Sequence, residues 1–142
     1  MIREMKKSDY PQVIELWVET EGVGVRHSDS EEGIAFYLDR NPGLSFVFES
    51  NKKIVGTIMS GHDGRRGYVQ HLMVSPEKRG GGIGTLLVNT CIDALKAASI
   101  LKSHIHVFQS NEIGQEFWKR LGWSERADLK TFSFINSKNS NI

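Results

Sequence analysis

The sequence has one cysteine, three prolines and no long apolar run, and these low counts exclude whole classes of protein. One cysteine cannot form an internal disulfide, so a disulfide-stapled scaffold is excluded. No stretch reaches the ~18 consecutive apolar residues that a membrane-spanning helix needs, and the N-terminal residues contain no signal-peptide core. We therefore expect a cytoplasmic protein with no membrane partner.

An excess of charge of one sign is also missing. The 142 residues include 18 Lys and Arg against 17 Asp and Glu, which gives a formal net charge of +1. This balance provides no overall field to attract nucleic acid, so we expect no nucleic-acid partner. The length and the 39% hydrophobic content fit one globular domain, which we place at residues 1–136, with 137–142 as a frayed tail.

The hydrophobic periodicity predicts a mixed α/β order. Ser28, three residues before Glu31, has the spacing of a capping box for the second of four helices. We expect helices at 8–20, from 28 to about 39, 82–98 and 111–121. We expect strands at 1–5, 44–49, 53–60, 67–74, 104–108 and 131–135. The three middle strands form an antiparallel meander, and residues 68–108 form one strand–helix–strand crossover.

The stretch "RGGGIG" at residues 79–84 directly precedes the longest predicted helix. Glycines there leave backbone N–H groups uncovered at the positive end of a helix dipole, which favours a phosphate group. The Walker pattern is excluded because Thr85 and Leu86, rather than Lys and Ser or Thr, follow Gly84. A simple linker would not need four glycines, each costing about 0.5–1 kcal/mol in chain entropy. The stretch therefore predicts a phosphate-binding turn.

"RGGGIG" also fits the Arg/Gln-x-x-Gly-x-Gly/Ala signature, and the chain here resembles the GNAT superfamily of acetyl-coenzyme A-dependent N-acetyltransferases. The preceding "HLMV" and "SPEKR" supply the expected context, and "NEIGQEFWKRLGW" at 111–123 is similar to the family's second signature. "GTIMSGHDGRRG" resembles an uncharacterised bacterial subgroup. The resemblance implies a single-domain α/β fold whose mixed, mostly antiparallel sheet has flanking helices and a splayed central strand pair.

The resemblance further implies acetyl-coenzyme A as the cosubstrate, with no metal. Backbone groups of three consecutive residues would bind the pantetheine arm: Leu72, Met73 and Val74. Asn111 would bind the same arm, and Phe117 and Trp118 would form a wall beside it. The pyrophosphate would be held by the amides of the glycine stretch: Arg79, Gly80, Gly81, Gly82, Ile83, Gly84 and Thr85.

The catalytic groups are less clear, because strand 67–74 lacks the carboxylate that many relatives carry. An acceptor amine is largely protonated at neutral pH and needs a base. The candidates are His71, Tyr68 and Glu21, while the resemblance implies the Met73 amide as oxyanion donor. Strand alternation places His71 and Tyr68 on opposite faces unless a bulge changes the phase.

The general acid is also missing, because Trp118 stands where the family usually has a tyrosine, and an indole does not give up its proton. Water or Tyr68 would have to protonate the leaving thiolate. The first hypothesis is direct acetyl transfer to an amino acid, a peptide or a small-molecule amine. Arg65 and Arg66, at a hairpin tip, would favour an acceptor with a carboxylate if the tip overhangs the site.

Two alternatives stay open. The missing acid and base also fit a catalytically impaired CoA-binding sensor or interaction module. Transfer through Cys91 is a weaker alternative, because this residue lies in an apolar helical pattern typical of a buried thiol. A homodimer is neither predicted nor excluded.

Overall fold

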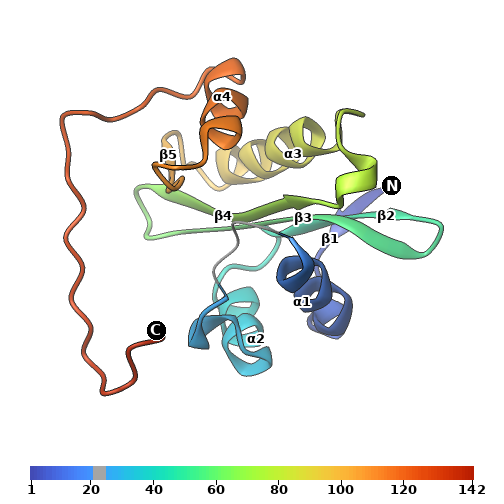
Figure 1. Cartoon of the computed structure of the whole chain (residues 1–142), viewed down its shortest axis with the longest axis horizontal. Helices are drawn as coiled ribbons and strands as arrows, with labels where there is room; N and C mark the ends of the chain where they lie inside the picture. The colour runs from blue at the N-terminus through green and yellow to red at the C-terminus, as the bar shows by residue number, and fades with distance from the viewer. Residues whose placement is uncertain (21–24) are drawn as a thin grey trace. The chain divides into compact units, whose positions relative to one another are not determined.

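The structure is a computed structural model that describes residues 1–20 and 25–142 (Figure 1). It contains two compact units, Met1–His106 and Val107–Ile142, each of which is described by itself. Glu21, one of the predicted bases, lies outside the described residues.

The first unit is built on a five-stranded sheet with the spatial order β1-β2-β3-β4-β5. All neighbouring strands are antiparallel except β4 and β5, which are parallel. The strands are β1 (Ile2–Glu4), β2 (Phe46–Ser50), β3 (Lys53–His62), β4 (Gly67–Val74) and β5 (Ser103–Ile105). The predicted meander and crossover are confirmed, and β5 ends earlier than expected.

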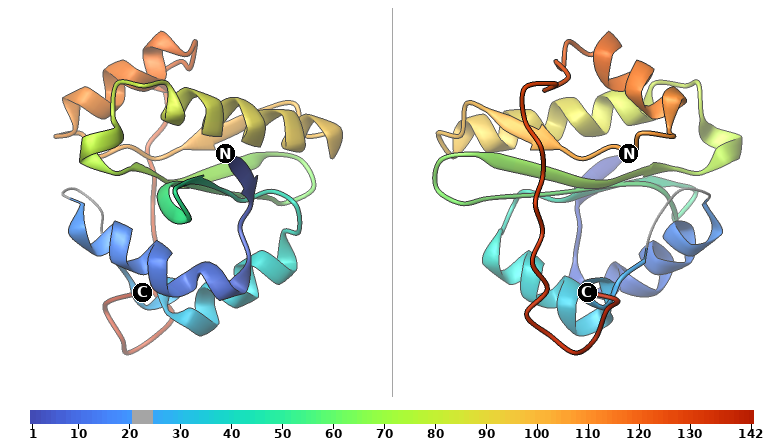
Figure 2. Two further views of the ribbon diagram at one scale, coloured as in Figure 1. Left: turned by 90° about the vertical axis from the view of Figure 1, so that its right-hand side faces the viewer. Right: turned by 60° about the vertical axis from the view of Figure 1, so that its left-hand side comes forward.

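Helices cover both faces of this sheet, as Figures 1 and 2 show. α3 (Ile83–Ala97) lies on one face, and α1 (Tyr10–Glu19) and α2 (Glu31–Arg40) lie on the other. Each helix buries an apolar stripe against the strands, and the core beneath α1 and α2 is centred on Trp17, Val47 and Met59. The α/β fold with flanking helices is therefore confirmed. No helix in the described part of the chain is long and apolar enough to cross a membrane.

A short 3₁₀ turn precedes α2, and the prediction that Ser28 caps this helix is wrong. The turn η2 (His27–Asp29) contains Ser28, and the N-cap of α2 is Ser30, whose side chain accepts the Gly33 N–H at 3.1 Å. The turn is closed by the Asp29 carboxylate, which accepts the Arg26 N–H at 2.8 Å. The helix thus begins later than predicted, and Asp29 is held immediately before it.

The second unit contains α4 (Glu112–Arg120), which Asn111 caps and Gly122 ends with a φ of 91°. The helix predicted at 111–121 is confirmed, but the strand predicted at 131–135 is not formed. Within this unit no described strand lies beside it, and a lone strand leaves its backbone groups unpaired. The Phe132 and Phe134 side chains on this segment are about nine-tenths exposed. The domain boundary at 136 stays a prediction.

Candidate active site

β4 carries a bulge at its centre. The register pairs Thr57 with Met73 and Met59 with Gln70, so two residues of β4 face the single Ile58 of β3. The extra residue is accommodated at His71, whose φ of 49° lies in the left-handed region. The bulge therefore changes the alternation of side chains along β4.

This change brings two of the predicted catalytic side chains to the same face. A Cβ placed on Gly67 would contact Leu95 of α3, so residue 67 faces α3 and Tyr68 faces the side of α1 and α2. Gln70 points to the same side as Tyr68, and beyond it the bulge turns His71 to that side as well. The bulge is the change of phase that the sequence analysis allowed for, so Tyr68 and His71 lie on the same face rather than on the opposite faces of an unbroken strand.

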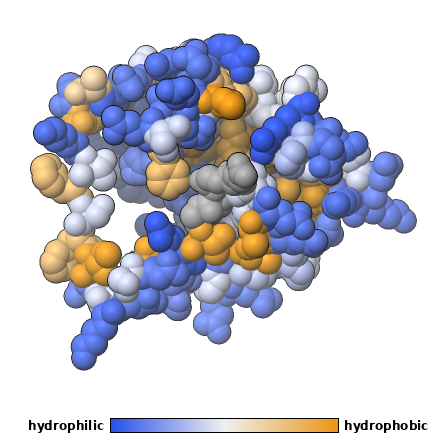
Figure 3. Space-filling view, in the orientation of Figure 1, coloured by the Kyte–Doolittle hydropathy of each residue, from blue (hydrophilic) through white to orange (hydrophobic). Residues whose placement is uncertain are grey.

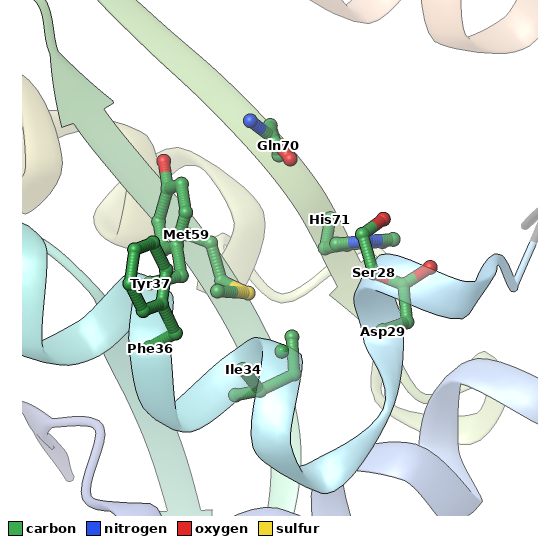
Figure 4. A pocket seen from close by; sticks show the side chains of 9 residues that line it. Ser28, Asp29, Ile34, Phe36, Tyr37, Met59, Gln70 and His71 are labelled. Carbon is green, nitrogen blue, oxygen red and sulfur yellow. The ribbon is translucent and has the colours of Figure 1, made fainter. Parts of the chain in front are cut away.

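Gln70 and His71 open into a pocket of about 230 Å³ between α2 and the sheet (Figure 4). Ser28 and Asp29 form one side of the pocket, and Met59 contributes from β3. α2 contributes three further side chains, those of Ile34, Phe36 and Tyr37. The pocket thus combines a mainly apolar wall with a histidine and a carboxylate.

His71 and Asp29 are joined by a hydrogen bond within this pocket. Nε2 of His71 lies 2.8 Å from Oδ1 of Asp29, and the two side chains are only 15% and 8% exposed. The imidazole also stacks on the Trp17 indole, with ring centroids 4.1 Å apart and an interplanar angle of 18°. The ring is therefore fixed on its face by packing and at its edge by a hydrogen bond.

The carboxylate also determines which ring nitrogen carries the proton. Burial raises the pKa of Asp29, but hydrogen bonds from the His71 ring and the Arg26 N–H outweigh it, so that the pKa is lowered overall. An ionised carboxylate only accepts hydrogen bonds, so Nε2 of His71 must donate. In the neutral ring the lone pair is then on Nδ1, which no described residue hydrogen-bonds. This nitrogen is available as a base.

Two buried hydrogen bonds orient the backbone of the bulge. Trp17 Nε1 donates to Thr57 Oγ1 at 3.0 Å, and Thr57 Oγ1 donates to the His71 carbonyl at 3.0 Å. The chain has no cis peptide bonds among the described residues. Across a trans peptide, the Leu72 N–H points opposite to the His71 carbonyl and therefore away from β3. The Leu72 N–H therefore points toward the edge of β4 on which β5 lies.

Beyond the bulge, β4 has an open edge on that side. β5 pairs with β4 only along Gly67–Val69, and no other pair between these two strands is formed in the described chain. This geometry is the splayed strand pair that the family resemblance implied, although β4 and β5 lie at one end of this sheet and not at its centre. Backbone groups of β4 that face away from β3 are thus available to a ligand.

The hydrogen-bonding alternation identifies which groups face the open edge. The Ser75 N–H donates to the Val55 carbonyl at 2.8 Å, so the next hydrogen-bonded pair along the ladder is Thr57 with Met73. Met73 therefore directs its amide toward β3, and Val74 faces outward, where its carbonyl accepts Arg79 Nε at 3.0 Å. This ladder does not favour the Met73 amide as the oxyanion donor. Leu72 and Val74 supply the outward groups.

The glycine stretch leads into α3 through two residues with left-handed backbone conformation. Gly82 is the N-cap of the 15-residue α3 with a φ of 87°, and Gly80 has a φ of 83°. The first hydrogen bond of α3 runs from the Leu86 N–H to the Gly82 carbonyl, so the amides of Ile83, Gly84 and Thr85 have no intrahelical acceptor. These uncovered amides fit an anionic group.

The remaining predicted cofactor residues lie in the second unit. The Asn111 side chain accepts the Gly114 N–H at 2.9 Å and so has a structural role as the cap of α4. Trp118 is buried and packs edge-to-face on Phe117 and Trp123, with ring centroids 5.3 and 4.7 Å away. Contacts of Asn111, Phe117 and Trp118 with a cofactor stay predictions.

Cys91 has the environment of a structural thiol. It is fully buried on α3, and burial raises its pKa to about 11. We expect the folded protein not to react with a thiol reagent such as dithionitrobenzoate at neutral pH, because little thiolate is present and access is blocked. Reaction should be complete in denaturant. Rapid stoichiometric reaction of the folded protein would contradict this assignment and revive transfer through Cys91.

Two residues of the site escaped the sequence interpretation. Asp29 lies 42 residues from His71 along the chain, and no motif connects them. Trp17 fitted the apolar pattern of a helix, which gave no reason to expect a stacking partner. Metal ligands are not evident either: no group of three or more His, Cys, Asp or Glu in the described chain is arranged to hold an ion.

The comparisons with known proteins agree with this geometry. A sequence model of the acetyltransferase (GNAT) family matches residues 10–123. Among solved structures, Ard1 from Thermoplasma volcanium superposes with a TM-score of 0.80 at 18% identity, over 89% of this chain and 84% of that one. PaiA N-acetyltransferase from Thermoplasma acidophilum, in complex with coenzyme A, superposes with a TM-score of 0.74 at 19% identity, over 85% and 87% of the two chains.

Glucosamine-6-phosphate N-acetyltransferase from Arabidopsis thaliana superposes with a TM-score of 0.69 at 20% identity, over 96% of this chain and 98% of that one. At these identities the structural likeness establishes the fold alone. The family match extends over well more than half of the chain and includes β4, the glycine stretch and α4. The protein therefore belongs to the acetyltransferase (GNAT) family.

Proposed function

We propose that the protein is an N-acetyltransferase that moves an acetyl group from acetyl-coenzyme A directly to an amine. One observation carries this proposal. The bulge in β4 presents the His71 ring to the pocket and, in the next residue, the Leu72 N–H to the open edge. A base on the face of β4 and an oxyanion donor at its edge are thus adjacent in sequence.

Acetyl-coenzyme A would bind along the open edge of β4. The outward groups of Leu72 and Val74 would bond the pantetheine arm, and the amides from Arg79 to Thr85 would hold the pyrophosphate. Each charge-assisted amide contact contributes about 1.5–3 kcal/mol, so a few are sufficient for micromolar affinity. When bound, acetyl-coenzyme A supplies an acetyl group activated as a thioester.

Residues of the protein would then transfer the proton and stabilise the charge that develops. Nδ1 of His71 accepts a proton from the acceptor amine, and the Asp29 carboxylate stabilises the imidazolium that results. The Leu72 N–H, in place of the predicted Met73 amide, donates to the developing oxyanion. The imidazolium can return its proton to the departing thiolate, so neither Trp118 nor a second acid is needed.

Tyr68 has a supporting role in this proposal and is not the first base. It lies on the same face as His71 and is 39% exposed, with its ring 6.0 Å from that of His104. It is therefore suited to carry a water path rather than to act as the first base. Glu21 is not assigned a role, because it lies outside the described residues.

The test begins with calorimetric titration of acetyl-coenzyme A into the protein, followed by an assay for free coenzyme A thiol with a panel of amines. Saturable binding with amine-dependent thiol release is the expected result. Binding without release from any amine would favour the alternative of a CoA-binding sensor or interaction module. No binding would contradict the assignment of the glycine stretch.

We expect Asp29→Asn to lower kcat toward the lower end of the range of about 10²–10⁴-fold typical of general-base catalysis. The Arg26 N–H needs an acceptor, so the new amide should place its oxygen there and its NH₂ against the His71 ring. That arrangement moves the ring proton to Nδ1 and blocks the base.

Two readouts separate this positioning role from general destabilisation. The KM for acetyl-coenzyme A should stay within about twofold of the wild type while kcat falls, since only the transition state is affected. Nitrogen-15 NMR of the imidazole should show the proton on Nε2 in the wild type and on Nδ1 in the variant. An unchanged tautomer together with an unchanged kcat would refute the positioning role.

A further inference from the structure

The pocket beside His71 is unusual in its charge. Its apolar wall consists of Ile34, Phe36 and Met59, together with the ring of Tyr37. Among the described lining residues Asp29 is the only carboxylate, and there is no Lys or Arg. Asp29 is already paired with His71. The described lining therefore offers no cation to an acceptor's carboxylate or phosphate and no unpaired carboxylate to a second ammonium.

The pocket is also small. Its volume of about 230 Å³ lies below the ~300–1,000 Å³ of typical ligand pockets. A charged group enclosed against such a wall loses its hydration, which costs several kcal/mol when no partner is present. An uncharged apolar group instead gains about 25 cal/mol for each Å² of its surface that is buried.

We propose that this pocket selects small primary amines whose non-reacting part is uncharged and mainly apolar, such as short alkyl- and arylalkylamines. The reacting nitrogen would lie at Nδ1 of His71, and the apolar part would lie against Ile34 and Met59. Amino acids and diamines are disfavoured because they bring a second charge into the pocket. This inference rests on the proposed acetyltransferase function.

The proposal replaces the carboxylate-bearing acceptor that Arg65 and Arg66 suggested. Neither arginine lines the pocket. Their backbone N–H groups both donate to Oδ1 of Asp63 at 2.8 Å, which closes the hairpin between β3 and β4. The charged tip thus has a local structural explanation that needs no acceptor.

Matched pairs of amines provide the test. 2-Phenylethylamine and phenylalanine differ by a carboxylate, and pentylamine and cadaverine differ by a second amine. We expect kcat/KM to be about 10- to 100-fold higher for the amine with the uncharged tail in each pair, since an unpaired buried group costs about 1–3 kcal/mol. Equal or reversed preference in both pairs would overturn the proposal.

A single substitution should move the preference. Phe36 is 72% exposed and lines the pocket, so Phe36→Arg is compatible with folding. The face drawn in Figure 3 is mostly hydrophilic with scattered apolar patches. The added cation should raise the phenylalanine-to-phenylethylamine ratio of kcat/KM by about tenfold, the effect of a charge-assisted contact. Leu101→Arg, at an 82% exposed residue that does not line the pocket, is the control and should leave the ratio unchanged.

The outcomes separate the two levels of the proposal. Acetyl transfer that favours phenylalanine or cadaverine would refute the selectivity and leave the acetyltransferase function intact. Acetyl transfer to other amines of the panel but to none of these four would refute the selectivity alone, whereas transfer to no amine, with acetyl-coenzyme A still bound, would refute the function and this inference with it. An unchanged ratio in Phe36→Arg would show that the acceptor's tail binds elsewhere.

Discussion

Replacing His71 with Asn is expected to lower kcat/KM by about 10²- to 10⁴-fold, the usual contribution of a general base, while acetyl-coenzyme A binding is retained. Asn removes the imidazole but tolerates the φ of 49° that the bulge requires, which most residues do not. The Thr57 hydroxyl bonds the backbone carbonyl of residue 71 and not its side chain, so this bond can keep the bulge in place in the variant. The variant thus removes the base and preserves the strand.

Kinetics of thiol release and calorimetric affinity are measured together, with thermal unfolding to confirm the fold. His62→Asn is the matched control, because His62 Nδ1 accepts only the Gly64 N–H of the hairpin and an Asn oxygen can replace it. In His71→Asn the Asp29 carboxylate loses its histidine partner, and a double variant with Asp29→Asn removes that carboxylate too. The activity of the double variant should match that of His71→Asn because His71 and Asp29 act as a unit. Full activity of His71→Asn would assign the base to Tyr68 or Glu21.

Replacing Gly81 with Glu is expected to weaken acetyl-coenzyme A binding by at least about 100-fold, since like charges brought together cost several kcal/mol. A Cβ at this residue would have only the Lys78 carbonyl, 3.8 Å away, within 4 Å, and its φ is not in the left-handed region. Gly82 is less suitable for this test because its φ of 87° would strain any side chain. Gly81 therefore isolates the effect of the charge.

Gly81→Gln is the control, with the same shape and no charge. It should bind acetyl-coenzyme A at least tenfold more tightly than Gly81→Glu, because the residual loss reflects only chain entropy and crowding. Calorimetry measures both affinities, and circular dichroism confirms that α3 is intact. Equal affinities for the Glu and Gln variants would place the pyrophosphate away from this turn.

Local patterns predicted the elements well where a segment's neighbours in space are also its neighbours in sequence. The meander from β2 to β4, the glycine turn and α3 follow directly from turn residues and helical spacing. Residues 131–135 have the alternation of a strand and yet form none, because a strand needs a partner and alternation alone does not provide one. The prediction of a helix cap at Ser28 was wrong because a 3₁₀ turn includes this residue, so the helix begins later in the chain.

The site was less predictable than the fold. His71 was identified by its chemistry, but its face depended on one extra residue in β4, and a bulge at a non-glycine residue leaves no clear mark in a sequence. Asp29 and Trp17 reach His71 through tertiary packing across more than forty residues. We propose Leu72 rather than Met73 as the oxyanion donor, because the hydrogen-bond phase along the ladder depends on a register that the sequence does not specify.

The bond between Arg79 and the Val74 carbonyl gives the open edge of β4 a side-chain partner. An outward carbonyl on an open strand edge invites pairing with strands of other molecules, and the Arg79 guanidinium binds it at 3.0 Å. If acetyl-coenzyme A binds along this edge as proposed, a pantetheine amide would compete with the arginine for this carbonyl, and the guanidinium would be free to turn toward the pyrophosphate. The same side chain would thus protect the edge from self-association in one state and bind a phosphate in the other.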